Sequence, residues 1–516
     1  MELPPLISGL LDPASYPAAA RGPVELIQTH VSYILLTPEF VYKIKKPVDF
    51  GFLDFTTLEK RLRYCEEEVR LNRRLAPGVY LGVVRVTEEG GRFRMEGEAQ
   101  TVEYAVKMRR IPAESLLEHR LAEGTANAET IERVARVIAA FHARAQDGER
   151  VAAFGSPEAI RRNTEENFAQ TGPFVGRTIS RRLFAAIKAY TEGFMRVHEG
   201  LFLKRMREGF IRDCHGDLHS EHISVNGRVE VFDCIEFNER FRLSDVVADA
   251  AFLSMDLDHH NRHDLTLAFE RAYFNASGDK EGVSLLDFYK CYRAYVRGKV
   301  EGFKSAEPEV GEREKRRSEM DARRHFHLSG LYASGGWRPE AVVVRGLPGT
   351  GKSTVARALA DRTGLVHLST DRIRKELAGI PPEEHRQERF GEGIYSAGFT
   401  EKVYRELLDR AEALMREGRS VILDATFSKA RFIEAALVSA RNSGAAFHVI
   451  ECEAGDEVVR ERLVKRRAEV TVSDAGVEVY RRQKEGYERW EGPSLRLTTT
   501  APAEELVSRV SREVFG

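Results

Sequence analysis

The spacing of apolar residues predicts two groups of strands around one helix near the start of the chain. Residues 24–47 alternate apolar and polar positions, which predicts a hairpin whose second strand covers 40–45. Residues 56–75 have a helical period that begins at threonines suited to an N-cap. Residues 79–112 return to short strands around a Gly-Gly turn. The helix is therefore expected between two groups of strands.

Helical periods dominate the next two hundred residues. Residues 129–145 and 180–208 predict amphipathic helices, and the polar residues 146–179 predict an irregular insertion between them. Residues 285–304 predict another helix, whose basic face either meets a phosphate or, as favoured, faces solvent. The densely charged residues 305–325 predict a solvated loop that enters a helix.

A loop and a hairpin are predicted within this helical part. Residues 213–237 predict a loop, a short strand, an Asn-Gly turn and a second strand that ends at Asp233. Residues 241–257 predict a helix on which Asp245 and Asp249 share one face, because they are four residues apart. These two carboxylates either face solvent or cap, or they brace the preceding loop.

A short apolar strand at 342–344 leads directly into a glycine-rich loop and a helical pattern. The loop fits the G-x-x-x-x-G-K-[ST] pattern, in which backbone N–H groups and a helix N-terminus surround a polyphosphate. Lys352 can reach the β- and γ-phosphates, and the Ser353 hydroxyl can bind Mg²⁺. The expected nucleotide-binding residues are Gly346, Gly349, Thr350, Gly351, Lys352, Ser353 and Thr354.

Two carboxylates follow predicted strands beyond this loop. Asp371 lies just after a strand at 366–369, with Arg374 three residues later, and the strand in 420–427 ends at Asp424. The carboxyl ends of strands in an open α/β sheet face the ligand. Asp371 can deprotonate an attacking hydroxyl, Arg374 can hold an anionic acceptor, and Asp424 is expected near Mg²⁺ or the acceptor.

The rest of the second half predicts an acceptor-side segment over 380–400, a strand over 447–452, a helix over 475–490 and a last strand over 494–499. A helix over 457–467 has the spacing of a lid that closes over a triphosphate. Its candidate arginines are Arg462, Arg466 and Arg467.

Lysines and carboxylates of the first half suggest a second site. Lys43 and Lys45 lie on one face of their predicted strand, where the alternative interpretation is an exposed strand edge. The predicted hairpin brings Asp217 and Asp233 together, and such a pair can act as a base and as a Mg²⁺ ligand.

The stretch His215-Gly216-Asp217, followed by Asp233, resembles the motif of aminoglycoside-phosphotransferase-like enzymes, a branch of the protein-kinase-like fold. The resemblance implies that Asp217 is the base that accepts the hydroxyl proton of the substrate and that Asp233 binds the metal. The metal-binding Asn of the family motif falls on His222 here, and imidazole suits Mg²⁺ poorly. Either His222 contacts a phosphate or the acceptor, or one metal site is altered.

The same resemblance implies a phosphate-anchoring lysine on the first strands and a glutamate partner on the helix. Lys43 matches the lysine, with Lys45 as the alternative, and Glu68 matches the partner. The implied small lobe covers about 20–112 and the large lobe about 113–335.

The second half resembles P-loop kinases of the polynucleotide-kinase and zeta-toxin type and several metabolite kinases. The resemblance rests on the GLPGTGKST loop, the Asp371-x-x-Arg374 element, the Asp-Ala-Thr at 424–426 and the arginine-bearing helix. It implies that Asp371 is the base and that Arg374 grips a phosphate of the acceptor. The acceptor stays open between a polynucleotide 5′-OH and a small metabolite.

Composition changes this picture little. A formal net charge of −1 gives no global field for nucleic acid, so any polyanion site must be local. Five scattered cysteines without a CxxC pair suit a reducing cytoplasm, and we expect no signal peptide and no membrane contact.

The sequence therefore predicts two modules, with a boundary in the Gly/Pro-rich residues 334–339. We expect a bilobal protein-kinase-like α+β fold over 1–335 and a P-loop NTPase with a doubly wound parallel α/β sheet over 340–516. The leading hypothesis is a bifunctional phosphotransferase in which each module uses ATP and Mg²⁺ to phosphorylate a hydroxyl. The alternative is a regulatory nucleotide-binding protein with one P-loop switch and a non-catalytic kinase-like sensor.

Overall fold

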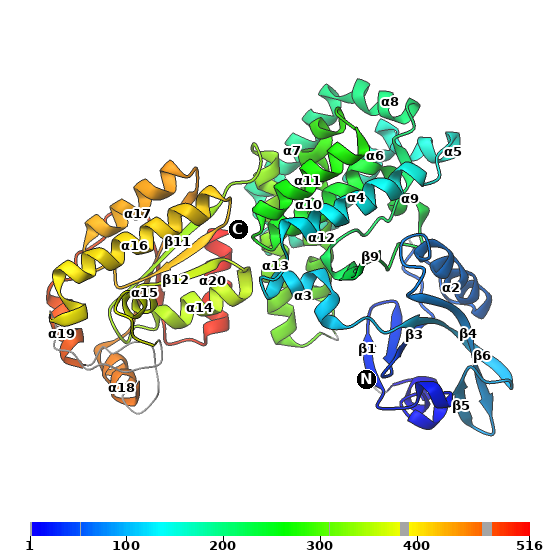
Figure 1. Cartoon of the computed structure of the whole chain (residues 1–516), viewed down its shortest axis with the longest axis horizontal. Coiled ribbons are helices and arrows are strands. Elements are labelled where there is room, and N and C mark those ends of the chain that lie inside the picture. The colour runs from blue at the N-terminus through cyan, green and yellow to red at the C-terminus, as the bar shows by residue number, and fades with distance from the viewer. Residues whose placement is uncertain (1–2, 52, 309, 382–391, 467–476, 516) are drawn as a thin grey trace. The chain divides into compact units, whose positions relative to one another are not determined.

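A computed structural model describes residues 3–51, 53–308, 310–381, 392–466 and 477–515 of the chain. The chain forms two compact units (Figure 1). The first comprises Met1–Asn163, Phe194–Asp256 and Ala268–Tyr289. The second comprises Thr164–Gly193, Leu257–Leu267 and Lys290–Gly516. The module boundary near 335–340 stays a prediction.

An antiparallel six-stranded sheet in the order β1-β2-β3-β6-β4-β5 forms the N-terminal part of the first unit. Its strands are β1 Glu25–Gln28, β2 Ser32–Leu36, β3 Phe40–Lys45, β4 Tyr80–Glu89, β5 Arg92–Met95 and β6 Gln100–Arg109, and the short helix α1 Pro5–Gly9 precedes them. Antiparallel pairing of β2 with β3 confirms the predicted hairpin.

Helix α2 Leu58–Asn72 packs against this sheet. The Thr57 side chain accepts a hydrogen bond from the Lys60 amide, so Thr57 is the N-cap. Cys65 and Val69 of α2 are buried against Tyr80 and Val106 of β4 and β6. The strand–helix–strand prediction is therefore confirmed, although β4 and β6 are longer than expected.

Helices make up most of the middle of the chain. They are α3 Leu117–Ala122, α4 Ala128–Arg144, α5 Glu149–Ala152, α6 Pro157–Thr171, α7 Arg181–Val197, α8 Glu199–Arg207, α9 Glu239–Arg242, α10 Val246–His259, α11 His263–Ser277, α12 Leu286–Ala306 and α13 Glu312–Ala333. Two short ribbons accompany them, β7 Ile211–Asp213 paired with β10 Leu243–Asp245, and β8 Ile223–Asn226 paired with β9 Arg228–Val231.

Three predictions in this part are wrong. Residues 146–179 are not irregular, because α6 starts after Ser156, whose hydroxyl accepts the Ala159 amide, and it buries the Phe168 side chain. Asp245 ends β10 and so shares no helix face with Asp249. Arg293 of α12 is buried, not solvated, because a helix face that others cover cannot be recognised from charge alone.

The second unit contains a five-stranded sheet in the order β12-β13-β11-β14-β15, with every neighbouring pair parallel. Its strands are β11 Glu340–Arg345, β12 Val366–Ser369, β13 Val421–Asp424, β14 Ala446–Glu453 and β15 Leu495–Thr498. The chain reverses its winding direction beside β11, which is where open α/β sheets bind ligands. The predicted doubly wound parallel sheet is confirmed.

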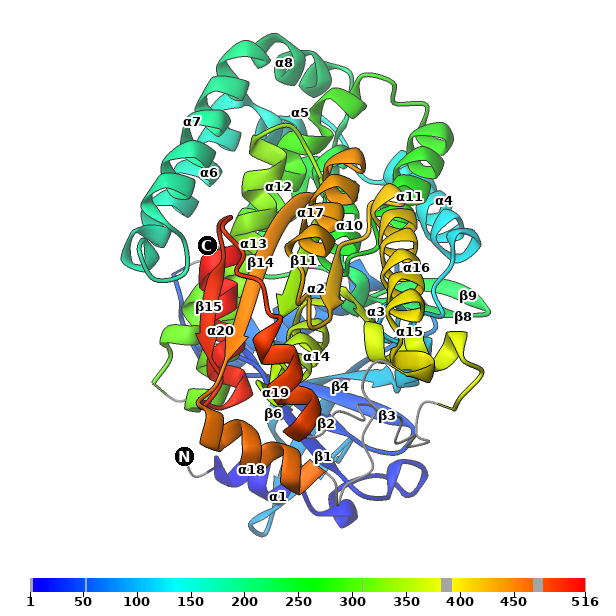
Figure 2. The ribbon, with the colours of Figure 1, turned by 90° about the vertical axis from the view of Figure 1, so that its left-hand side faces the viewer.

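Helices cover both faces of this sheet (Figures 1 and 2). The C-terminal helices are α14 Lys352–Thr363, α15 Thr370–Leu377, α16 Ala397–Arg416, α17 Ala430–Asn442, α18 Asp456–Arg466, α19 Val477–Glu485 and α20 Ala503–Val514. Val343 belongs to the core under α16 and α17, and its neighbour Val344 to the core under α14 and α20. This alternation explains why β11 is buried along its whole length.

Two details of the C-terminal end differ from the sequence predictions. The helix expected over 475–490 is shorter, since α19 ends at Glu485. β15 confirms the last strand expected over 494–499, but helix α20, which follows it, was not predicted; the buried Val507 and Val510 of α20 close one face of the sheet. Among the described residues, no helix has the length and apolarity needed to cross a bilayer.

Candidate active sites

The loop between β11 and α14 has the backbone of a phosphate-binding loop. Gly349 and Gly351 adopt φ of 81° and 83°, a conformation that other residues rarely take. A Cβ on Gly349 would lie 2.9 Å from the Val459 side chain, so the loop also has no room for one. Lys352 begins α14 and is 9% exposed, with Ser353 half-buried beside it. The N-terminus of α14 thus faces the loop as phosphate binding requires.

Asp424 at the end of β13 fits the predicted metal position. Its carboxylate is buried, and Oδ2 lies 3.1 Å from Nε2 of His367 on the neighbouring strand β12. Oδ1 is also buried and has no hydrogen-bond partner among the described residues. A buried carboxylate oxygen without a donor is costly unless a cation or its water occupies the position. The donor set of Asp424 and Ser353 is oxygen only, which is what Mg²⁺ prefers.

The backbone after Asp424 is strained. Phe427 has a φ of 45° and is fully buried, which is unusual for an aromatic residue. Its amide donates to the Tyr404 hydroxyl at 2.9 Å, and the Tyr404 ring stacks on Phe432 at a centroid distance of 3.8 Å. Strain of this kind persists only where surrounding contacts enforce it, and it is concentrated at functional sites.

Asp371 and Arg374 lie in α15, directly after β12. Asp371 is partly exposed, so an acceptor hydroxyl can approach it. The Arg374 guanidinium is buried and donates at 2.6 Å to the carbonyl of Ile394 and at 3.3 Å to the Thr400 hydroxyl. Arg374 therefore holds the start of α16, and only part of its donor capacity is left for an acceptor.

A cavity of about 320 Å³ adjoins the phosphate-binding loop, lined by Gly349, Thr354, Arg462, Thr499, Ala501 and Leu506. The Arg462 guanidinium donates at 3.0 Å to the hydroxyl of Thr499. The Thr499 hydroxyl in turn donates to the carbonyl of Thr350 in the loop. Arg462 thus lies beside the cavity. Arg466 is the last residue of α18, and Arg467 lies outside the described residues.

In the first unit, both candidate lysines contact Glu68. Lys43 Nζ lies 2.9 Å from Glu68 Oε1 and 2.6 Å from Asp233 Oδ1. Lys45 Nζ lies 2.7 Å from Glu68 Oε2 and also forms an ion pair with Glu236. Neither lysine is at an exposed strand edge, since their side chains are 12% and 1% exposed. Lys43 is the one that reaches the predicted metal ligand.

The ion pairs control the ionisation of this group. Burial alone would lower the pKa of Lys43, but Asp233 and Glu68 outweigh it and hold that pKa well above its usual value. Burial likewise would raise the pKa of Asp233, but Lys43 and His222 hold it well below its usual range. Asp233 is therefore a carboxylate at neutral pH, as a metal ligand must be.

His222 lies between the two predicted carboxylates. Its Nδ1 is 3.0 Å from the backbone oxygen of Asp217 and 3.5 Å from Asp217 Oδ2, and its Nε2 is 3.5 Å from Asp233 Oδ2. A second imidazole, that of His219, has its Nε2 3.4 Å from Asp217 Oδ2. The hairpin thus brings Asp217 and Asp233 to one site, and His222 occupies the position that an Asn takes in the family motif.

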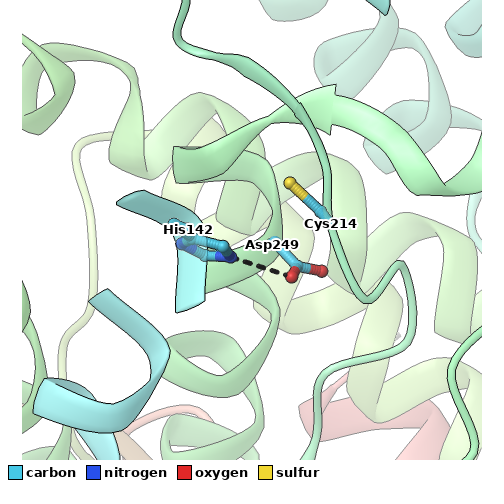
Figure 3. A group of neighbouring side chains, drawn as sticks. All are labelled: His142, Cys214 and Asp249. Carbon is cyan, nitrogen blue, oxygen red and sulfur yellow. Dashed lines mark hydrogen bonds and ion pairs between the residues drawn. The ribbon is translucent and has the colours of Figure 1, made fainter. Parts of the chain in front are cut away.

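Asp249 braces the loop that carries Asp217. Its two oxygens accept the backbone amides of His215 and Gly216 at 2.9 and 2.8 Å, and Oδ2 lies 3.1 Å from His142 Nε2 (Figure 3). All of these groups are buried. The cluster of His142, Cys214 and Asp249 in Figure 3 has ligand atoms close together. Because both carboxylate oxygens already accept hydrogen bonds, we assign it to positioning the loop.

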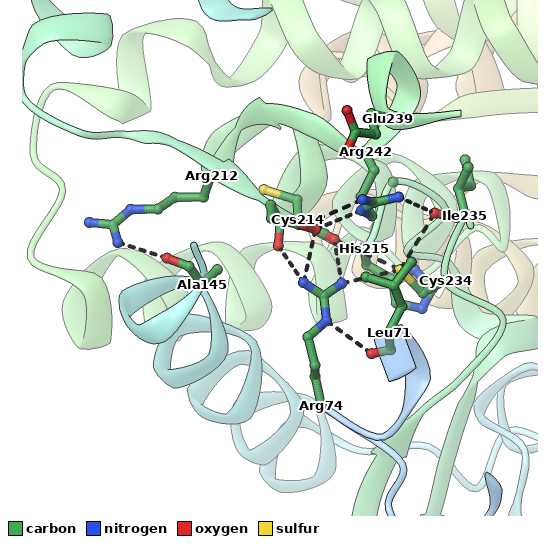
Figure 4. A network of polar contacts seen from close by, with 12 residues as sticks. Leu71, Arg74, Ala145, Arg212, Cys214, His215, Cys234, Ile235, Glu239 and Arg242 are labelled. Carbon is green, nitrogen blue, oxygen red and sulfur yellow. Dashed lines mark hydrogen bonds and ion pairs between the residues drawn. The ribbon is translucent and has the colours of Figure 1, made fainter. Parts of the chain in front are cut away.

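Two arginines also hold the loop that carries Asp217 (Figure 4). Arg74, which follows α2, donates to the carbonyls of Asp213 and Cys214 at 2.8 and 2.9 Å. Arg242 donates to Asp213 Oδ1 at 2.6 Å and to the carbonyl of Ile235 at 2.8 Å. Charge-assisted bonds to backbone carbonyls fix the loop relative to α2.

Several of these residues carry no role in the sequence analysis. They are Arg74, His142, His219, Glu236, Arg242 and His367. His367 lies two residues before the end of a strand, so the period of two could have drawn attention to it. His219 lies two residues after Asp217 in the same loop, so its closeness in sequence could have drawn attention to it. The others contact at least one partner more than twenty residues away in sequence, for which the chain alone contains no signal.

Two protein-family models match the chain. The phosphotransferase enzyme family matches residues 53–286, and an AAA domain matches residues 342–490. An uncharacterized protein of Mycobacterium tuberculosis is 32% identical over 498 residues, which is 96% of each chain. An uncharacterized protein of Mycobacterium bovis matches with the same identity and coverage.

The chain belongs to the same family as these mycobacterial proteins.

It therefore combines a phosphotransferase module of the protein-kinase-like class with a P-loop module. Both resemblances stated from the sequence are confirmed at this level. Among solved structures, the chain is similar to the APS kinase of Mycobacterium tuberculosis, with 23% identity over 34% of this chain and 96% of that chain and a TM-score of 0.25. It is also similar to a gluconokinase of Sinorhizobium meliloti, with 18% identity over 35% of this chain and 97% of that chain and a TM-score of 0.25.

Proposed function

We propose that the chain is a bifunctional ATP-dependent phosphotransferase in which each module transfers the γ-phosphate of ATP to a hydroxyl. The observation that supports this best is that each module has a lysine at a position suited to phosphate binding and its own pair of carboxylates, Lys43 with Asp217 and Asp233 in the first and Lys352 with Asp371 and Asp424 in the second. Phosphoryl transfer needs mainly positioning and charge neutralisation from the protein.

In the P-loop module, Lys352 and the loop amides would hold the triphosphate, and Ser353 with Asp424 would hold Mg²⁺. Bound Mg²⁺ would neutralise charge on the phosphate oxygens. Asp371 would take the proton of the acceptor hydroxyl, since it is the partly exposed carboxylate at the carboxyl edge of the sheet. The acceptor is a polynucleotide 5′-OH or a small metabolite, and the N–H groups of Arg374 favour an acceptor that carries an anion.

In the first module, Lys43 would anchor the phosphates and Asp217 would accept the hydroxyl proton of a sugar-like or aminoglycoside-like acceptor. The Asp217 side chain is 31% exposed and lies on a loop that Asp249 and Arg74 hold rigid. A base on a rigid loop with an open side is what proton transfer from a bound hydroxyl requires. The free cysteines are buried, in keeping with a cytoplasmic protein.

The test uses the full-length chain with labelled ATP and three acceptor groups: 5′-OH RNA or DNA oligonucleotides, neutral sugars with aminoglycosides, and anionic metabolites. Asp371→Asn should abolish labelling by the P-loop module only, and Asp217→Asn labelling by the first module only. Asp361→Asn, an exposed carboxylate of α14, is the matched control and should leave both unchanged.

A chain that hydrolyses ATP but labels no acceptor in any group would favour the regulatory alternative. Loss of one labelling activity in both catalytic variants would show that the two carboxylates serve a single reaction and would refute bifunctionality.

A further inference from the structure

The first module has an imidazole where its family has an amide, and this imidazole faces the predicted metal ligand Asp233. We propose that the metal position of this module is built for a divalent transition ion, bound by Nε2 of His222 and Oδ2 of Asp233, and not for Mg²⁺. The inference rests on the proposed function of the first module and deepens it, because the resemblance stated from the sequence implies a metal at Asp233, but its test does not depend on catalysis.

The separation of the two ligand atoms suits a transition ion. Nε2 of His222 and Oδ2 of Asp233 are 3.5 Å apart, which is too long for a strong hydrogen bond. An ion about 2.0–2.1 Å from both atoms in tetrahedral geometry would separate them by about 3.4 Å. Octahedral Mg²⁺ at a similar distance would bring adjacent ligands to about 2.9 Å and would require oxygen donors. The separation of the ligand atoms and the nitrogen donor therefore both favour a transition ion over Mg²⁺.

The tautomer of His222 is set for metal binding. Nδ1 lies 3.0 Å from the backbone oxygen of Asp217, and a carbonyl can only accept, so Nδ1 carries the hydrogen. In the neutral ring this leaves the lone pair on Nε2, which is the nitrogen that faces Asp233. A metal-binding histidine typically donates its other N–H to a backbone carbonyl or carboxylate in this way.

The orientation of Asp233 is also fixed by its neighbours. Lys43 binds its Oδ1 at 2.6 Å, which turns Oδ2 toward His222. The Asp233 backbone has a φ of 62°, and its amide donates to the Tyr80 hydroxyl at 3.1 Å. Outer contacts of this kind fix ligands before the ion arrives. The ring of His222 is also held, since it lies 4.1 Å from the His219 ring and 5.9 Å from the Phe232 ring.

The site is open enough for an ion and for further ligands. The side chains of His222 and Asp233 are 14% and 40% exposed. Asp217, His219 and His222 also offer ligand atoms that all lie within 4.8 Å of one another, so the surroundings are rich in imidazole and carboxylate donors. Imidazole nitrogen raises affinity for ions from Mn²⁺ toward Zn²⁺ and contributes little for Mg²⁺. The remaining coordination positions would be left to water and phosphate oxygens.

The experiment titrates the metal-free full-length chain with Co²⁺ in excess Mg²⁺ and records visible absorption and Co X-ray absorption. The P-loop site is expected to be filled by Mg²⁺, but the imidazole of His367 lies beside Asp424 there. His367→Asn is therefore titrated in parallel and should leave the Co²⁺ signal unchanged. We expect one Co²⁺ with the strong visible bands of four- or five-coordinate geometry and a histidine nitrogen in its first shell.

His222→Asn should weaken Co²⁺ binding at least about 100-fold and remove these bands, because loss of a direct ligand exceeds the 10–100-fold typical of outer contacts. Asp233→Asn should do the same. His119→Asn, which changes an exposed histidine of the same unit, should change neither the affinity nor the spectrum. Circular dichroism establishes that each variant is folded.

Equal Co²⁺ affinity in wild type and His222→Asn, or a first shell of oxygen alone in wild type, would overturn the proposal even if the module transfers phosphate. The X-ray absorption of wild type decides the question should His222→Asn fail to fold. Conversely, Co²⁺ bound through His222 in a first module that labels no acceptor would refute the proposed phosphate transfer by that module and would still support the metal site.

Discussion

Nζ of Lys43 lies 2.6 Å from Oδ1 of Asp233, which joins a strand of the N-terminal sheet to the second residue after β9. Lys45, two residues further along the same strand, points to the same side but contacts only Glu68 and Glu236 among the carboxylates of the described residues. The two lysines therefore have different tasks, which substitution can separate.

We expect Lys43→Ala to lower phosphate transfer by the first module about 100-fold or more, because the charge on the phosphates then lacks its protein cation. Lys45→Ala should instead lower the free energy of unfolding by about 3–5 kcal/mol, since it leaves buried carboxylates without their partner. Urea denaturation and acceptor labelling measure the two effects. Lys60→Ala, which removes an exposed ion pair with Asp54, should change the free energy of unfolding little, because solvent screens the pair. If Lys43→Ala lowered stability and Lys45→Ala lowered phosphate transfer, the roles assigned to the two lysines would have to be exchanged.

Asp249→Asn should loosen the loop that carries Asp217. An amide has one accepting oxygen, so one of the two backbone amides of His215 and Gly216 would lose its acceptor at a cost of about 1–3 kcal/mol. Hydrogen exchange should become faster at these two amides. Exchange unchanged from wild type would mean that Asp249 is not the brace. Asp147→Asn, at an exposed carboxylate, serves as the control.

Lys352→Ala, introduced together with Asp217→Asn to silence the first module, should reduce the remaining ATP turnover about 1,000-fold, because the β- and γ-phosphates lose their cation. Lys402→Ala, on the exposed side of α16, should have no effect in the same background. Turnover near the wild-type rate in the Lys352 variant would refute the assignment of this loop as the nucleotide site.

The ionisation of Glu340 should make the free energy of unfolding fall in acid. Burial alone would raise the pKa of Glu340, but hydrogen bonds from His327 and His448, at 3.0 and 2.6 Å, lower it to about 2. A carboxyl whose pKa is lower in the folded chain stabilises it fully above the unfolded value near 4.3, and this contribution falls as pH decreases toward 2. The contribution is on the order of 3 kcal/mol.

Melting temperatures of wild type and Glu340→Gln test this effect. Wild type should be more stable at pH 6, and the difference should shrink as pH falls from about 5 to 3 because the glutamine does not titrate. A difference that stays constant over this range would contradict the role of Glu340.

The sequence determined the elements whose signal is local. The phosphate-binding loop follows from residues contiguous in the chain, because consecutive backbone amides and one lysine make the site. The hairpin of β2 and β3 and the parallel strands of the second sheet follow from periods of two and from apolar runs. The pairing of Lys43 with Glu68 could also be predicted from the family resemblance, since a strand and the next helix contribute one residue each.

Only the tertiary structure decided which residues act across the chain. Nη1 of Arg374 donates to the carbonyl of Ile394, Asp249 holds the amides of His215 and Gly216, and His222 lies between Asp217 and Asp233. Each of these roles depends on the position that the polar atoms of a side chain take in the folded chain. A buried polar group must find a partner wherever the fold provides one, and that partner is set by three-dimensional proximity and not by spacing in the sequence.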